Sequence, residues 1–181
     1  MTRIIAGKYK GQRIEVPKSG VRPTTDRVRE AIFSALDSRI ANWQEEHVLD
    51  VFAGSGGLGI EALSRGASSA TFLEKDRHTA EILAKNLAKV GAQGEVVLGA
   101  ADKFQTQQKF TLVFLDPPFA IEDAYLTLLL NQFAPSIELG ALVLVERGKE
   151  NSFQWPTGYT QVFERGYGDS LIFLAESKES R

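Results

Sequence analysis

The sequence of 181 residues has no cysteine, one methionine and two histidines. Without cysteine it has no disulfide, no thiol nucleophile and no cysteine-ligated zinc site. The two histidines show no metal-ligand spacing, so we expect no metal centre. No run of about eighteen apolar residues is present, which argues against a membrane-spanning helix. The first residues also lack the apolar stretch of a signal peptide, and we therefore expect a cytoplasmic protein.

Charge is distributed unevenly along the chain. Residues 1–40 hold nine Lys/Arg and four Asp/Glu, whereas residues 41–181 hold twelve and nineteen. A basic extension on an acidic body favours a polyanion as the partner of the extension, although a solvated basic face would give the same count. The apolar fraction of 43% is enough for one full core. We expect a monomer whose main domain is formed by residues 41–181.

The main domain alternates between strand and helix patterns. Strands are predicted at 48–52, 70–73, 96–98, 111–115 and 141–145, and helices at 58–65, 77–90 and 124–133. This alternation predicts a parallel sheet with helices on both faces. Two further strands, 160–165 and 170–174, are joined by a connection too short for a parallel crossover, so they should be antiparallel.

The basic extension contains signals for a hairpin and a helix. Residues 3–6 and 13–16 flank a glycine-bounded basic turn, which predicts the hairpin. Either residue of the pair Thr24-Thr25 can cap the helix that follows. Arg27 and Arg29 lie outside its apolar stripe, so we expect both to face outwards.

The stretch Asp116-Pro117-Pro118-Phe119 follows the apolar strand 111–115. Two prolines cannot continue a sheet, so the chain turns into a stiff loop at the carboxyl end of the strand, where ligands bind in open α/β sheets. Carboxylate and carbonyl oxygens can accept the N–H bonds of an exocyclic amine, while an aromatic ring stacks on its base. The alternatives are a simple strand terminator and a phenylalanine that packs in the core.

A glycine-rich turn follows the strand 48–52. Gly54, Gly56 and Gly59 form a G-x-G-x-x-G pattern, in which glycine permits a tight turn and a close approach of a ligand to the backbone. Glu74 ends the next strand, where an acidic side chain can hold the hydroxyl groups of a ribose. A turn that binds nothing would satisfy the same pattern.

These features fit a nicotinamide dinucleotide or an adenosine-bearing sulfonium. Asp50 lies in the strand before the glycine loop, where its charge attracts a cationic group such as an α-amine and repels a pyrophosphate. Asp116 adds a second negative charge across the cleft. The charges therefore favour the sulfonium.

With these motifs, the chain resembles the RsmD family of class I S-adenosylmethionine-dependent methyltransferases, which methylate the exocyclic N2 of a guanine in bacterial 16S rRNA. The resemblance rests on residues 3–11, 22–33, 49–56, 58–67 and 116–119. It implies an α/β, Rossmann-like fold with a mostly parallel seven-stranded sheet and a C-terminal antiparallel hairpin. Residues 1–40 would form a small N-terminal hairpin-and-helix extension that binds RNA and borders the cofactor.

The resemblance also implies roles for individual residues. The target guanine would be held by the catalytic residues Asp116, Pro117, Pro118 and Phe119. The cofactor S-adenosyl-L-methionine would contact Asp50, Phe52, Ala53, Gly54, Ser55, Gly56, Gly59, Glu74, Lys75, Ala101 and Asp102. The 16S rRNA, free or in a small-subunit particle, would contact Lys8, Lys10, Arg13, Arg22, Thr24, Arg27 and Arg29. Alanines stand where many relatives have a polar residue near the adenine, which leaves the role of Asp102 open.

The expected chemistry is N-methylation, with Asp116 and a carbonyl of the proline pair orienting the amine and Asp116 or water taking its proton. The alternatives are a DNA adenine-N6 or cytosine-N4 methyltransferase, a protein-glutamine methyltransferase, a non-catalytic nucleotide-sensing RNA-binding module and a nicotinamide dehydrogenase. We expect no room for the target-recognition region that a sequence-specific DNA enzyme needs.

Overall fold

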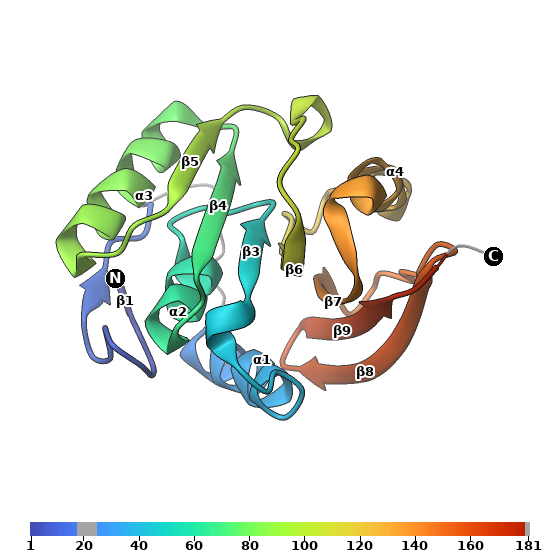
Figure 1. Cartoon of the computed structure of the whole chain (residues 1–181), viewed down its shortest axis with the longest axis horizontal. Coiled ribbons are helices and arrows are strands. Elements are labelled where there is room, and N and C mark those ends of the chain that lie inside the picture. Colours follow the sequence, from blue (N-terminus) through green and yellow to red (C-terminus); the bar gives the residue numbers. More distant parts are fainter. Residues whose placement is uncertain (18–24, 180–181) are drawn as a thin grey trace.

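The structure is a computed structural model that describes residues 1–17 and 25–179. In this part of the chain, seven strands form one sheet (Figure 1). Their spatial order is β5 (Glu95–Leu98), β4 (Ser69–Glu74), β3 (His47–Asp50), β6 (Phe110–Leu115), β7 (Ile137–Gly148), β9 (Ser170–Ser177) and β8 (Tyr159–Tyr167). Neighbouring strands from β5 to β7 are parallel, and β9 pairs antiparallel with β7 and β8. The predicted parallel sheet with an antiparallel C-terminal hairpin is confirmed.

Helices cover both faces of this sheet, as predicted. They are α1 (Asp26–Asp37), α2 (Gly57–Arg65), α3 (Arg77–Val90) and α4 (Asp123–Phe133), with short 3-10 turns η1 (Trp43–Glu45), η2 (Ala101–Lys103) and η3 (Ala134–Ser136). Helices α1, α2 and α3 pack on the face that carries Val48 and Phe114, and α4 packs on the face that carries Leu49 and Val113. All four side chains are buried, because successive residues of a strand point to opposite faces. Among the described residues, no helix is long and apolar enough to cross a membrane.

Local signals set several of the element boundaries. Thr25 caps α1, since its side chain accepts a hydrogen bond from the first turn of the helix. Asp76 caps α3 in the same way, and Gly91 ends α3 with a φ of 74°, as predicted. Strands β7 and β9 run beyond the predicted 141–145 and 170–174, because each is paired on both sides.

The N-terminal hairpin is present but has less regular pairing than predicted. Its strands are β1 (Thr2–Arg3) and β2 (Arg13–Ile14), which pair antiparallel. Ile4 and Ile14 are buried in the same hydrophobic cluster as α1, α2 and α3. The hairpin is therefore attached to the main core through its apolar side chains.

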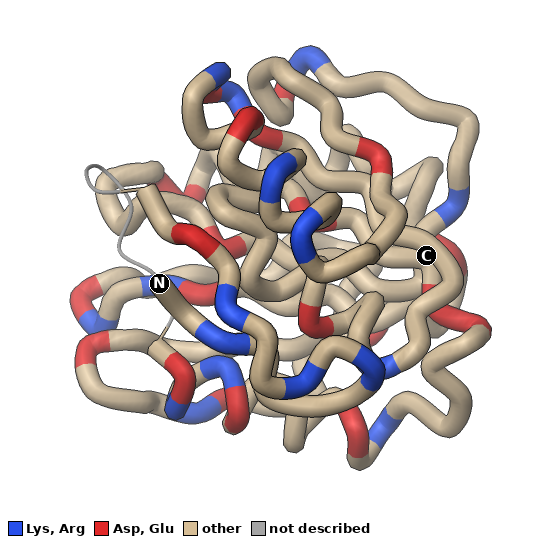
Figure 2. Tube along the Cα trace, turned by 90° about the vertical axis from the view of Figure 1, so that its left-hand side faces the viewer, with Lys and Arg blue, Asp and Glu red and all other residues tan. Residues whose placement is uncertain are grey.

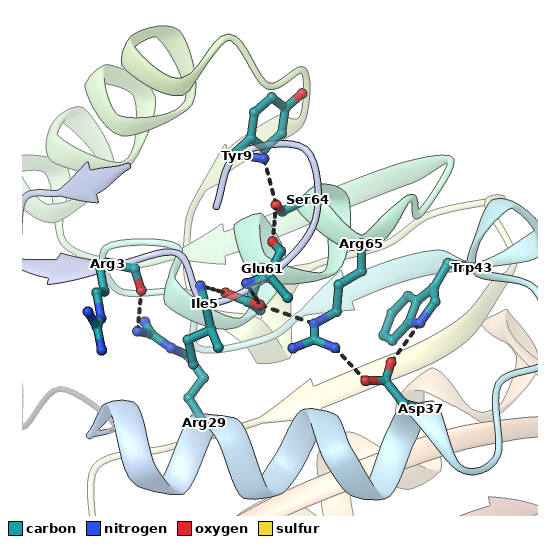
Figure 3. A network of polar contacts seen from close by, with 10 residues as sticks. Arg3, Ile5, Tyr9, Arg29, Asp37, Trp43, Glu61, Ser64 and Arg65 are labelled. Carbon is teal, nitrogen blue, oxygen red and sulfur yellow. Dashed lines mark hydrogen bonds and ion pairs between the residues drawn. The ribbon is translucent and has the colours of Figure 1, made fainter. Parts of the chain in front are cut away.

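Polar contacts also fasten the hairpin to α2 (Figure 3). The buried carboxylate of Glu61 accepts hydrogen bonds from the backbone N–H groups of Ile5 and Ala6, at 2.8 and 3.0 Å. Gly7 has a φ of 78°, and a Cβ at this position would lie only 1.8 Å from the carbonyl oxygen of Ser64. The extension and α2 are thus held in a fixed relation.

Candidate active site

A cavity of about 1230 Å³ opens at the carboxyl ends of the central parallel strands. Asp50 ends β3, Glu74 ends β4, Asp116 follows β6, and Glu146 lies near the end of β7; all of them line the cavity. Ligands bind at this edge of open α/β sheets. Although carboxylates gather here, no group of three or more potential ligand side chains within the described residues could hold a metal ion. The structure thus brings the glycine loop, Glu74 and the proline loop to one cavity.

The glycine loop joins β3 to α2 along one wall of the cavity. Gly54 and Gly56 have φ values of 54° and 89°, a left-handed conformation that glycine adopts without strain. Gly59 permits close packing of helix against sheet, because a Cβ there would lie 2.2 Å from the ring of Phe72. The cavity is lined by the predicted residues Phe52, Ala53, Gly54 and Ser55. Gly56 and Gly59 do not line it and instead shape the loop and the start of α2.

Glu74 links the end of β4 to the glycine loop. Its Oε2 accepts a hydrogen bond from the backbone N–H of Gly54, and its Oε1 accepts one from that of Asp76, each at 2.9 Å. A carboxylate has about four acceptor positions, so both oxygens retain lone pairs for the hydroxyl groups of a ligand. Lys75 lines the cavity beside Glu74. The two backbone bonds therefore fix a half-buried carboxylate at the wall.

Asp50 is a buried acid, with 1% of its surface exposed. Its Oδ2 accepts a hydrogen bond from the backbone N–H of Gly59 at 3.0 Å. Burial raises the pKa of Asp50 from 3.8 to about 7; the Gly59 N–H opposes this shift and the charge of Glu74 adds to it. A cationic ligand group at this wall would favour the ionised carboxylate.

The turn after β5 forms another part of the cavity wall. Gly99, Ala100 and Ala101 line the cavity. Asp102 does not; its carboxylate instead accepts a hydrogen bond from the Tyr125 hydroxyl at 3.3 Å. Tyr125 of α4 does line the cavity, although no motif in the sequence marks it.

The proline loop, Asp116–Phe119, follows the carboxyl end of β6 as predicted, and all of its residues line the cavity. Pro117 is buried, whereas Asp116 and Phe119 are half-buried. The Phe119 ring lies close to Gly148 at the end of β7, where a Cβ would come within 3.2 Å of the ring. Glycine at this position therefore leaves room for the ring.

Arg147 anchors the chain that leaves the proline loop. The side chain is fully buried; its Nε donates to Asp123 Oδ1 at 2.8 Å and its Nη2 donates to the carbonyl oxygen of Ile121 at 2.5 Å. These bonds hold the segment between the loop and α4 against β7. Sequence reasoning missed Arg147, because a charged residue near the end of an apolar strand belongs to no motif.

Glu146 places a second carboxylate beside the proline loop. It is 4% exposed, lines the cavity, and accepts a hydrogen bond from the Ser170 hydroxyl at 2.7 Å. Because Leu115 and Val145 are paired in the parallel register, Asp116 and Glu146 follow at neighbouring strand positions. The sequence offered one signal for Glu146, an acidic residue at the end of an apolar run.

The basic residues predicted to contact RNA have different environments. Lys8, Lys10 and Arg13 are exposed on the hairpin outside the cavity, and Arg27 is exposed and lines it. The expectation that Arg29 faces outwards is wrong, because this side chain is 1% exposed and lies between α1 and the hairpin. Arg22 and Thr24 lie outside the described residues.

Comparison with a solved structure identifies the class of fold. A protein named YhhF from Escherichia coli, described as a candidate methyltransferase, superposes with a TM-score of 0.86 and 36% sequence identity, over 98% of both chains. The mostly parallel seven-stranded sheet with its antiparallel C-terminal hairpin therefore has the Rossmann-like methyltransferase fold.

The sequence comparisons identify the family. The profile of a family described as "Conserved hypothetical protein 95" matches residues 2–176, and the chain belongs to this family. It is 40% identical to ribosomal RNA small subunit methyltransferase D of Haemophilus influenzae over 177 residues, which cover 92% of this chain and 89% of the relative. The protein of the same name from Escherichia coli K12 is 49% identical over 121 residues, and this match spans 65% of the chain and 60% of that relative. The resemblance to the RsmD family is confirmed.

Proposed function

We propose that this chain transfers a methyl group from S-adenosyl-L-methionine to the exocyclic N2 of a guanine in bacterial 16S rRNA, free or in a small-subunit particle. The observation that carries the proposal is that the proline loop, Asp116–Phe119, lines the same cavity as the glycine loop and Glu74. The names of the relatives support rRNA of the small subunit as the substrate class.

The cavity walls fit the proposed cofactor. Glu74 offers lone pairs to ribose hydroxyl groups, Asp50 offers a carboxylate to the α-ammonium group, and the alanines after Gly99 offer an apolar surface to the adenine. A pyrophosphate would meet two carboxylates here and would be repelled. When bound, S-adenosylmethionine supplies a methyl group on a positively charged sulfur, which needs no further activation as an electrophile.

The protein's task is then to prepare the amine. The lone pair of guanine N2 is delocalised into the ring, so the free amine is planar and a poor nucleophile. Asp116 and a carbonyl of Pro117 or Pro118 accept its N–H bonds, which favours a pyramidal nitrogen and orients its lone pair. Asp116 takes the proton released on methylation or passes it to water. Orientation of the two reactants supplies most of the rate enhancement.

The pair of carboxylates favours guanine over adenine. Guanine presents two neighbouring donors on its pairing edge, N1–H and N2–H, which Glu146 and Asp116 can accept together. Adenine presents one donor and one acceptor there, so one carboxylate would face a lone pair and lose its hydrogen bond. This chemistry supports guanine N2 against adenine N6 as the methylated group.

The exposed hairpin gives the phosphates of RNA a surface to bind. Lys8, Lys10 and Arg13 are exposed, and Figure 2 shows several basic positions along the segment that begins at the N-terminus. Thr2 and Glu15, at the two ends of the hairpin, line the cavity. An RNA strand bound by the hairpin would therefore lie close to the entrance of the cavity, where Arg27 adds another exposed cation.

Labelled S-adenosylmethionine tests this proposal. The protein is incubated with 16S rRNA, with small subunits that lack the modification and with duplex or single-stranded DNA, and the methylated base is mapped by mass spectrometry. We expect N2-methylguanine in the rRNA or subunit samples and no label in DNA. Label on an adenine or cytosine, or transfer only to DNA, would refute the proposal.

A further inference from the structure

Arg29 is a buried cation that the proposed mechanism does not use. Its side chain is 1% exposed, and its direct ion pair, to Asp26 at 2.8 Å, is with a carboxylate whose side chain is 40% exposed. Burial lowers the pKa of Arg29, but a guanidinium remains charged at neutral pH. A buried charge is costly unless several partners satisfy it, so its surroundings should explain its position.

The hydrogen bonds that Arg29 makes with the described residues come from one guanidinium nitrogen, Nη2. Nη2 donates to the Thr2 hydroxyl at 2.8 Å, to the carbonyl oxygen of Arg3 at 2.6 Å and to Asp26 Oδ1 at 2.8 Å. Figure 3 shows the side chain reaching from α1 to the backbone of Arg3. The nearby carboxylate of Glu61 is already bonded to the hairpin backbone and to Arg65.

A second nitrogen of the guanidinium, Nη1, lies against the glycine loop. Nε is buried and has no hydrogen-bond partner among the described residues. Nη1 lies beside Gly57, where an added Cβ would be 3.3 Å from it. Arg29 and Gly57 both line the cavity, and Gly57 is the first residue of α2. A buried guanidinium that places Nη1 beside a helix N-terminus, and whose Nε has no partner among the described residues, is suited to an anionic group.

The other basic residues that line the cavity are exposed. Lys75 and His78 follow β4 and are exposed beside Glu74, and Arg27 is exposed on α1. Among the described residues, Arg29 is therefore the one cation of the cavity lining that is buried. The buried anion Asp50 is bonded to Gly59 in the same first turn of α2. Charges of opposite sign thus flank the start of one helix.

We infer that Arg29 binds the α-carboxylate of the methionine end of the cofactor, while Asp50 binds its α-ammonium group. This inference rests on the proposed function, because it requires S-adenosylmethionine in the cavity. Arg29, which the family resemblance placed among the RNA contacts, is then a contact of the cofactor instead. This assignment also gives the hairpin a second role, since Thr2 and Arg3 hold the guanidinium in position.

A pair of ligands isolates the carboxylate. Decarboxylated S-adenosylmethionine keeps the sulfonium and the amine but has no carboxylate. Because charge-assisted hydrogen bonds are strong, wild-type protein should bind S-adenosylmethionine at least about tenfold more tightly than this analogue in calorimetric titrations. Arg29→Gln should lose most of this preference by weakening S-adenosylmethionine alone. The matched control is Arg39→Gln, at an exposed arginine just beyond α1, which should keep the preference.

Several results would overturn the inference. These are equal affinity of the wild type for both ligands, an equal loss for both in Arg29→Gln, and loss of the preference in Arg27→Gln instead. If thermal unfolding shows that Arg29→Gln does not fold, Arg29→Lys takes its place and should show a smaller loss of preference. If neither variant folds, equal affinity of the wild type for both ligands still overturns the inference. Binding of neither ligand by the wild type would instead refute the proposed function.

Discussion

Asp50 and Gly59 are joined by a 3.0 Å hydrogen bond that ties the end of β3 to the first turn of α2. The bond fixes a buried carboxylate on the cavity wall and occupies one backbone donor at the start of the helix. Gly59 cannot be replaced without loss, because a Cβ there would meet the Phe72 ring. The same pair therefore determines the shape of the glycine loop and the charge that faces a ligand.

The raised pKa of Asp50 predicts a pH-dependent affinity for S-adenosylmethionine. The free protein holds a proton on Asp50 below about pH 7, whereas the ammonium group of the ligand favours the ionised carboxylate. Affinity should therefore increase about tenfold between about pH 5.5 and about pH 7, below the range in which a free α-amine loses its proton. Calorimetry across this range measures it. Asp50→Asn should flatten the profile, and a flat profile in the wild type would contradict the assigned role.

The same pKa predicts that Asp50 costs stability in the absence of ligand. Its folded-state pKa lies above the ordinary value of 3.8, so its contribution is most favourable below about pH 4 and declines as the pH rises towards about 7. At pH 8, Asp50→Asn should stabilise the ligand-free protein by about 1–3 kcal/mol, and this gain should shrink at pH 5. Urea unfolding at both values measures it. A variant that is less stable at pH 8 would be evidence against the burial penalty.

Asp116 should be needed for transfer and not for cofactor binding. Without the Asp116 carboxylate, the target amine is not oriented and its proton loses an acceptor. Asp116→Ala should therefore lower kcat by at least about 10³-fold. The affinity for S-adenosylmethionine should stay within about threefold, well under 1 kcal/mol. Glu138→Gln, an exposed acid at the opposite end of β7, is the control for altered charge. Wild-type turnover in Asp116→Ala would remove the basis of the proposed mechanism.

Phe119 should act through base stacking. Loss of the stacking contact in Phe119→Ala should lower kcat/KM for the RNA by the equivalent of about 1–3 kcal/mol, whereas Phe119→Tyr should stay close to the wild type. Gly148→Ala should produce a partial effect, because its methyl group would crowd the Phe119 ring. Steady-state kinetics on modification-free subunits distinguishes these variants. If Phe119→Ala instead lowers the melting temperature without lowering kcat/KM in the folded protein, the ring has only a packing role.

The exposed hairpin should bind RNA mainly through phosphates. The combined change of Lys8, Lys10 and Arg13 to alanine should weaken RNA binding and reduce the slope of log K against log salt by about 2–3. Fluorescence anisotropy at several salt concentrations measures both quantities. The control replaces the exposed residues Lys103, Lys109 and Lys178, which lie outside the extension. An unchanged slope in the hairpin variant, or an equal change in the control, would remove the hairpin from the RNA surface.

Much of the fold was predictable because its signals are local. Apolar runs mark strands that are buried on both faces, and residues such as Gly91 and Pro117 mark where elements end. The rule that ligands bind at the carboxyl edge of such a sheet was enough to expect Gly54, Glu74 and Asp116 at one cavity.

The remaining features depend on contacts between distant parts of the chain. Arg29 was expected outside because its position lies off the apolar stripe of its helix, and nothing local indicates that Thr2 and Arg3 would enclose it. Glu146 depends on a hydroxyl group from the next strand, Ser170, and Asp102 on a tyrosine of another helix. Such polar pairs arise from tertiary packing and leave no periodic pattern in a sequence.

The most direct test of the central claim is a crystal structure with S-adenosylhomocysteine and an RNA fragment that carries the target guanine. The account predicts that the Asp116 carboxylate lies within hydrogen-bonding distance of guanine N2, with the base against Phe119 and the amine facing the cofactor's sulfur. It would be contradicted by an Asp116 side chain that points away from the cavity, or by a cavity that, with the cofactor bound, has no space for a purine.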